Sequence, residues 1–152
     1  MPLTPRQVTL IKGSFAKVEP IANQAAKIFY GKLFEYDPAL RQLFTHDMQE
    51  QGRKLMAVLK VAVNSLNNLE ALIPTLHKLA DRHLEYGVKV DDYTPVGNAL
   101  LFALKKGLGE EFTPELRQAW IEVFQVVANT MRAHAYPGFN PRTYRNTRNY
   151  NR

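Results

Sequence analysis

Cysteine is absent from the 152 residues of this chain. Its absence excludes disulfides, thiolate-bound zinc, iron–sulfur clusters and cysteine nucleophiles, so any metal must be held mainly by histidine or carboxylate. Long apolar runs are absent too. The longest, Ala99–Leu104, is far shorter than the ~20 residues that span a bilayer, and Met1–Gln7 leads into no apolar stretch of the kind found in secretory signals. We therefore expect a soluble, cytoplasmic protein with no membrane partner.

The usual signatures of enzymes are also missing. The chain contains no Gly-x-Ser-x-Gly elbow, no Walker loop, no His-Glu-x-x-His pair and no Gly-x-Gly-x-x-Gly fingerprint. Hydrolase, P-loop and zincin chemistry are therefore not indicated, and the chain has no recognisable dinucleotide site of its own.

Positive charge is concentrated at the C-terminus. The net charge is +6, and four of these charges lie after Tyr136, in a stretch without acidic residues: Arg142, Arg145, Arg148 and Arg152. The body then carries only about +2, which argues against a basic nucleic-acid-binding face. We expect one domain over residues 1–136, followed by a basic tail over 137–152 without fixed structure. The arginine spacing in that tail also allows a nucleic-acid or lipid contact, but a solvated tail is the simpler interpretation.

The apolar pattern predicts helices throughout. Four of them are marked by a capping side chain followed by proline: Thr4-Pro5, Asp37-Pro38, Thr94-Pro95 and Thr113-Pro114. Gln7 completes a possible capping box with Thr4. The expected helices cover about Pro5–Val18, Pro20–Tyr36, Pro38–Phe44, Gln51–Leu66, Leu76–Tyr86, Pro95–Leu108 and Pro114–Tyr136. No alternating strand pattern of useful length appears, so we predict an all-α domain of about seven helices.

One histidine lies on the apolar face of its helix. In Leu76–Tyr86, His83 shares a face with Leu76 and Leu79, and a neutral imidazole in apolar surroundings needs a hydrogen-bond partner or a metal. A satisfied core histidine is the simpler interpretation of this segment alone. Tyr30 and Gln51 also fall on apolar faces, where unpaired polar groups are costly. A single imidazole beside a large apolar pocket is an arrangement that holds haem. The other histidines are less suited: His77 turns away, His46 lies in a polar turn, and His134 lies near a helix end.

Several short motifs occur in a familiar order and spacing. They are Phe29-Tyr30-x-x-Leu33-Phe34, Pro38, Leu43-Phe44, Gln51-x-x-Lys54-Leu55, Asn68-Leu69-x-x-Leu72-Ile73-Pro74, Arg82-His83-x-x-Tyr86-Gly87-Val88, Tyr93-x-x-Val96-Gly97 and Ala119-Trp120. Together they resemble the bacterial single-domain globins, which are similar to the haem domain of flavohaemoglobins and include globins of thermophilic and acidophilic bacteria. The resemblance runs from about Thr4 to Tyr136. It implies the globin fold, a three-over-three helical sandwich with a short or absent fourth helix, and haem b as cofactor.

The resemblance also implies a role for individual residues. His83 matches the proximal iron ligand, and Tyr30 and Gln51 match the distal pair that donates hydrogen bonds to bound oxygen. The other residues expected to bind the cofactor are Phe44 on the haem face, Leu55 in the distal wall, Lys54 at the pocket edge near a propionate, and Val88, Tyr93 and Val96 on the proximal side. In flavohaemoglobins a glutamate of the last helix pairs with the proximal histidine. Here the matching place falls near Ala135, beside His134, with no carboxylate nearby, which puts peroxidase-like activation in doubt.

These residues imply a haem protein that binds O2 tightly and reversibly at ferrous iron. The first alternative is a nitric-oxide dioxygenase that takes electrons from a separate reductase, with NO as a second gaseous partner, and a gas sensor is a lesser alternative. A non-haem helical binding module is the interpretation left if no haem binds. We expect a monomer or weak dimer without a nucleic-acid partner.

Overall fold

The computed structural model describes residues 3–44 and 47–146, so His46 lies outside the described residues. These two ranges form helices and turns without any strand, which confirms the all-α prediction. The α-helices are α1 (Pro5–Val18), α2 (Ala22–Tyr36), α3 (Met48–Asn64), α4 (Ile73–Glu85), α5 (Tyr93–Leu108) and α6 (Pro114–Ala135). Short 3₁₀ turns connect them: η1 (Glu19–Ile21), η2 (Pro38–Leu43), η3 (Leu69–Leu72), η4 (Val90–Asp92) and η5 (Gly109–Glu111). The short helix predicted from Pro38 is thus a 3₁₀ turn.

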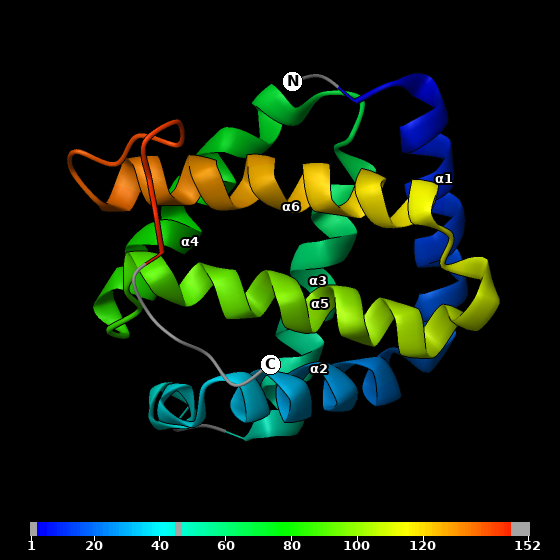
Figure 1. Cartoon of the computed structure of the whole chain (residues 1–152), viewed down its shortest axis with the longest axis horizontal. Helices are drawn as coiled ribbons and strands as arrows, with labels where there is room; N and C mark the ends of the chain where they lie inside the picture. The colour runs from blue at the N-terminus through cyan, green and yellow to red at the C-terminus, as the bar shows by residue number, and fades with distance from the viewer. Residues whose placement is uncertain (1–2, 45–46, 147–152) are drawn as a thin grey trace.

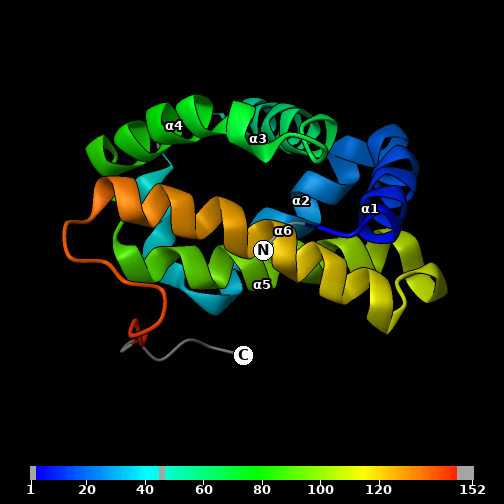
Figure 2. The ribbon, with the colours of Figure 1, turned by 90° about the horizontal axis from the view of Figure 1, so that it is seen from above.

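The helices pack as a three-over-three sandwich. Helix α2 packs most extensively on α5 and also contacts α3, while α4 and α1 both pack on α6. Seen from above, α3 and α4 lie on one side of the pair formed by α5 and α6 (Figure 2). None of the described helices is both long and apolar enough to cross a bilayer.

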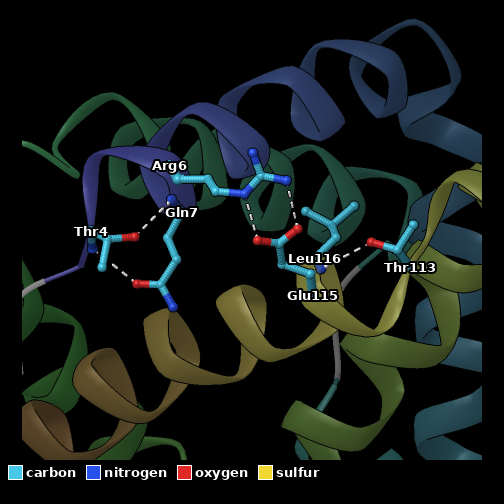
Figure 3. A network of polar contacts seen from close by, with 6 residues as sticks. All are labelled: Thr4, Arg6, Gln7, Thr113, Glu115 and Leu116. Atoms are coloured by element: carbon cyan, nitrogen blue, oxygen red, sulfur yellow. Dashed lines mark hydrogen bonds and ion pairs between the residues drawn. The ribbon is translucent and has the colours of Figure 1, made fainter.

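Three of the four predicted helix starts are confirmed. The Thr4 and Thr113 hydroxyls accept the Gln7 and Leu116 N–H groups, and the Gln7 side chain accepts the Thr4 N–H, which completes the capping box (Figure 3). The Asp37 carboxylate likewise accepts the Ala39 N–H at the start of η2.

The prediction for Thr94-Pro95 is wrong, because α5 begins at Tyr93 with Asp92 as its N-cap residue. The turn η4 runs directly into the helix, and the Asp92 carboxylate accepts the Lys89 N–H at 2.9 Å. The Thr94 hydroxyl instead accepts a hydrogen bond from Arg132 at 3.3 Å.

The first and last α-helices are tied together by polar side chains. Arg6 donates two hydrogen bonds to the Glu115 carboxylate, at 2.6 and 2.8 Å, on an exposed surface (Figure 3). Inside the core, the Trp120 indole N–H donates to the Ser14 hydroxyl at 3.0 Å, and that hydroxyl donates to the Ile11 carbonyl at 2.8 Å. These bonds hold α1 against α6 both at the surface and in the core.

The chain after α6 turns back across the molecule. It runs over α6 towards the start of α5 (Figure 1), where the Tyr144 hydroxyl donates to the Asp91 carboxylate. The expected tail began at residue 137. In its described part, residues 137–146, Tyr144 and Asn146 bond to Asp91 while most of the other residues are exposed; residues 147–152 lie outside the described residues. The boundary at Tyr136 stays a prediction.

Candidate functional site

The crossing of α2 and α3 positions the first group of predicted site residues. Gly52 lies on α3 at the crossing, and a Cβ there would come within 2.9 Å of the Ala26 Cβ on α2. The missing side chain therefore lets the two backbones approach closely. At this crossing the Tyr30 hydroxyl of α2 donates to the Gln51 carbonyl of α3 at 3.3 Å. The structure thus places the Tyr30 hydroxyl against the backbone of Gln51, and the distal role of the two side chains stays a prediction.

The Tyr30 ring lies among other aromatic rings. Its centroid is 4.9 Å from that of Phe29, 5.4 Å from that of Phe44 and 6.1 Å from that of Phe34. Burial raises the pKa of Tyr30 to about 12, because the phenolate would lose its hydration. The hydroxyl therefore keeps its proton at neutral pH. Its bond to Gln51 is longer than the 2.7–2.8 Å typical of O–H···O bonds, so we regard it as a weak bond that a better acceptor can replace.

The remaining residues on this side differ in exposure. Phe44 and Leu55 are half-buried against the larger apolar cluster, whereas Lys54 is exposed. Phe44 ends η2, and its ring also packs edge-on against Phe34 at 5.3 Å. An exposed lysine beside half-buried apolar side chains is expected at the edge of a pocket and not at its floor.

His83 lies in the last turn of α4. Its Nδ1 is 2.6 Å from the Leu79 carbonyl oxygen one turn earlier. A carbonyl only accepts, so this contact places the proton on Nδ1 and leaves the lone pair on Nε2. Burial lowers the pKa of His83, and the bond to Leu79 opposes that shift in part. The result is a neutral, oriented imidazole, the form that binds metals.

The turn after α4 links His83 to Val88. Gly87 has φ +95°, a conformation that favours glycine, and it ends the helix. The Val88 N–H then returns to the His83 carbonyl at 3.0 Å, and the Val88 carbonyl accepts the Tyr136 hydroxyl at 2.5 Å. The backbone N–H and the backbone carbonyl of Val88 are both hydrogen-bonded, so its half-buried side chain is fixed relative to His83.

Tyr93 adds a buried phenol behind the imidazole. Its ring centroid is 6.4 Å from that of His83, with 27° between the planes. Burial raises the pKa of Tyr93 strongly; nearby Tyr136 and Asp92 raise it further, and Arg132 lowers it. The Tyr93 hydroxyl is buried and has no hydrogen-bond partner among the residues that the structure describes. A buried donor of this kind requires a partner, and a polar group of a bound molecule would supply one.

The apolar interior of the described chain consists of two clusters. Val96, Phe44 and Leu55 belong to the rim of the larger cluster, whereas Val88 and Tyr93 belong to the smaller one. Domains of this size usually have one contiguous core. The predicted site residues are therefore divided between two apolar clusters, and a flat apolar molecule bound between the clusters would contact both.

The sequence pattern of the globin family matches residues 27–131. The chain belongs to the globin family. Neuroglobin from Tetraodon nigroviridis is 32% identical over 143 residues, which cover 85% of this chain and 90% of that protein. A flavohemoprotein from Halalkalibacterium halodurans is 31% identical over 123 residues, and the match spans 79% of this chain but only 30% of the relative.

Two solved structures share this globin fold. An engineered carbene transferase, whose parent from Rhodothermus marinus carries the name nitric oxide dioxygenase, is 26% identical with a TM-score of 0.79, covering 88% of this chain and 93% of that one. A hexacoordinated heme protein from an anhydrobiotic tardigrade has a TM-score of 0.80 at 19% identity, covering 88% of this chain and 96% of that one, and supports the fold alone.

Globins bind haem, and the side chains of this globin fit that group. His83 offers its Nε2, and the Tyr93 hydroxyl has no hydrogen-bond partner among the described residues. The half-buried apolar side chains of the two clusters include Phe44, Leu55, Val88 and Val96. Sequence reasoning missed Gly52 and Arg132. The signal for Arg132 was present, since it falls among Ala128, Met131 and Ala135 at the spacing of a buried stripe.

Proposed function

We propose that this globin is a haem b protein that binds O2 tightly and reversibly, with His83 as the iron ligand and Tyr30 and Gln51 as distal hydrogen-bond donors. The observation that carries the proposal is the Nδ1 contact of His83 with the Leu79 carbonyl, which leaves Nε2 as the nitrogen for a metal. A monomer or weak dimer in the cytoplasm belongs to the same proposal, and sedimentation of the purified protein tests the oligomeric state.

Haem iron supplies a position where diatomic gases bind. The chain supplies the surroundings. Leu79 holds the imidazole in one tautomer, while Phe44 and Leu55 keep water from the distal side. Tyr30 keeps its proton and can turn its hydroxyl from the Gln51 carbonyl towards a bound ligand, because the bond it gives up is long. The Gln51 amide is the second proposed donor, and the exposed Lys54 would meet a propionate at the edge.

Replacing Tyr30 by phenylalanine tests the distal half of the proposal. A hydrogen bond to a charged acceptor contributes about 1.5–3 kcal/mol, so its loss speeds ligand dissociation by roughly ten- to one-hundred-fold. Stopped-flow displacement of O2 measures this rate. Tyr36→Phe is the matched control, because Tyr36 is the last residue of the same helix and its ring pairs with Lys32. An O2 dissociation rate that is the same in Tyr30→Phe and in Tyr36→Phe removes Tyr30 from the mechanism.

A second candidate is nitric-oxide dioxygenase activity with a separate reductase. It is favoured by the name of the Rhodothermus marinus relative and by the flavohemoprotein matches. Continuous NO consumption by the purified protein with a reductant present supports it. Decay limited to a single turnover supports the O2 carrier. A gas sensor ranks last.

A further inference from the structure

Arg132 is a cation inside the proximal half of the molecule. Its exposed fraction is only 7%, and its Nε and Nη2 donate to the Val90 carbonyl at 3.0 Å and to the Thr94 hydroxyl at 3.3 Å. Its guanidinium carbon lies 5.3 Å from the centroid of the Tyr93 ring. Arg132 therefore joins α6 to the start of α5, directly behind the ring that stacks on His83.

Two rings of the chain after α6 also lie near this guanidinium. The ring centroids of Tyr144 and Phe139 lie 4.7 and 5.8 Å from the guanidinium carbon. The Tyr144 hydroxyl donates to the Asp91 carboxylate, and the Asn146 amide donates to the Asp91 carbonyl at 3.4 Å. We call Arg132, Asp91, Phe139 and Tyr144 the proximal clamp. It encloses the charge between aromatic faces, a favourable setting for arginine.

Charges of both signs act on Tyr93. The carboxylate of Asp92, 5% exposed, raises the pKa of Tyr93, and the charge of Arg132 lowers it. An isolated buried cation would be very costly, and the acidic residues beside it offset that cost. Replacing Arg132 by a neutral residue leaves excess negative charge near the proximal imidazole, and replacing Asp92 leaves excess positive charge there.

We propose that Arg132, held in place by residues 137–146, is a positioning residue that favours the ferrous over the ferric state of the bound haem. This inference rests on the proposed function. The Tyr93 ring centroid lies 5.3 Å from the Arg132 guanidinium carbon and 6.4 Å from the His83 ring centroid, so the guanidinium lies within about 12 Å of the His83 ring. The ferric centre carries one more positive charge than the ferrous centre, so a nearby cation disfavours it. The iron would be bound by the His83 ring, and one charge at about 12–15 Å changes an equilibrium constant by roughly six- to tenfold at an effective dielectric constant of ~20.

The experiment compares one-electron reduction of the haem-loaded variants at a mediated electrode that supplies the electron. Arg132→Met removes the charge and keeps an apolar stem, whereas Arg132→Lys keeps the charge. At fixed electrode potential, we expect the ferrous-to-ferric ratio to fall by about three- to tenfold in Arg132→Met and to recover in Arg132→Lys. Asp92→Asn should shift the ratio in the opposite direction. Arg117→Met, an exposed arginine of the same helix, is the control.

A second measurement tests the role of the tail in haem-free protein. Tyr144→Ala removes one face of the clamp, so backbone amides of η4 and of the first turn of α5 should exchange hydrogen faster than in wild type, while those of α1 stay unchanged. Equal exchange in η4 overturns the role of residues 137–146. If wild type takes up haem but Arg132→Met and Arg117→Met show equal ratios, the inference about Arg132 is overturned and the proposed function stands. If wild type gives no Soret band, both fall.

Discussion

The close crossing of α2 and α3 makes opposite predictions for two identical substitutions. Gly52 and Gly13 both lie inside α-helices, and alanine is favoured over glycine there by about 0.8–1 kcal/mol. At Gly13 in α1 a new Cβ meets no atom within 4 Å. At Gly52 it meets the Ala26 Cβ at 2.9 Å, a contact that neither helix can relieve by a rotamer change.

The expected change in the free energy of unfolding combines the helix preference for alanine with the cost of the contact at Ala26. Overpacking a tight contact costs about 1–3 kcal/mol, so Gly52→Ala should lie between neutral and about 2 kcal/mol less stable than wild type. Gly13→Ala should be about 1 kcal/mol more stable. For a chain of this length the gap corresponds to roughly 2–12 °C in Tm. Urea unfolding of the haem-free variants, followed by circular dichroism, measures it without a contribution from bound haem.

A functional change should accompany the loss of stability. Gln51 precedes Gly52, so moving α3 away from α2 lengthens the 3.3 Å contact between the Tyr30 hydroxyl and the Gln51 carbonyl. That contact competes with a bound ligand for the Tyr30 hydroxyl, so O2 should dissociate more slowly from Gly52→Ala than from Gly13→Ala, the opposite of the change expected for Tyr30→Phe. If Gly52→Ala is as stabilising as Gly13→Ala, the crossing is not tightly packed and the account of how Tyr30 meets Gln51 is wrong.

Two further predictions concern buried polar groups. Ser14→Ala leaves the Trp120 N–H without its acceptor, which should lower the free energy of unfolding in urea by about 1–3 kcal/mol. The control Ser65→Ala removes a solvent-facing bond to the Val61 carbonyl and should change that free energy by less than about 0.5 kcal/mol. Equal effects of the two variants would contradict the role of Trp120. Because burial raises the pKa of Tyr30 to about 12 in the folded protein, the O2 dissociation rate should stay flat between about pH 6 and 10, and the stability that the protonated phenol supports should be lost only above its unfolded value of about 10. A step in the rate below pH 9 would show that Tyr30 is not the buried donor.

Local chemistry explains why much of the fold could be predicted. The capping box of Thr4 and Gln7 involves residues three apart, so sequence spacing alone specifies it, and the structure confirms it. Thr94-Pro95 has the same local form, yet α5 begins earlier because η4 leads into it and Arg132 occupies the Thr94 hydroxyl. A partner 38 positions away along the chain cannot be inferred from a cap motif.

The site was predictable in its residue types and less so in its contacts. The spacing and order of motifs led to His83, Tyr30 and Gln51, and their roles stay predictions. The approach at Gly52 depends on which residue of α2 faces it, a property of the crossing. The tail without fixed structure stays a prediction, and its composition alone could not show that the Tyr144 ring lies against the buried Arg132 guanidinium.

The bonds between α1 and α6 have a consequence for synthesis. Ser14 finds Trp120 across 106 positions of the chain, and Gln7 donates to Glu122 across 115. During synthesis α1 therefore leaves the ribosome well before its polar partners in α6 exist. Such distant pairings slow folding and leave early segments open to aggregation, so we expect nascent chains that end before α6 to depend on chaperones until α6 emerges.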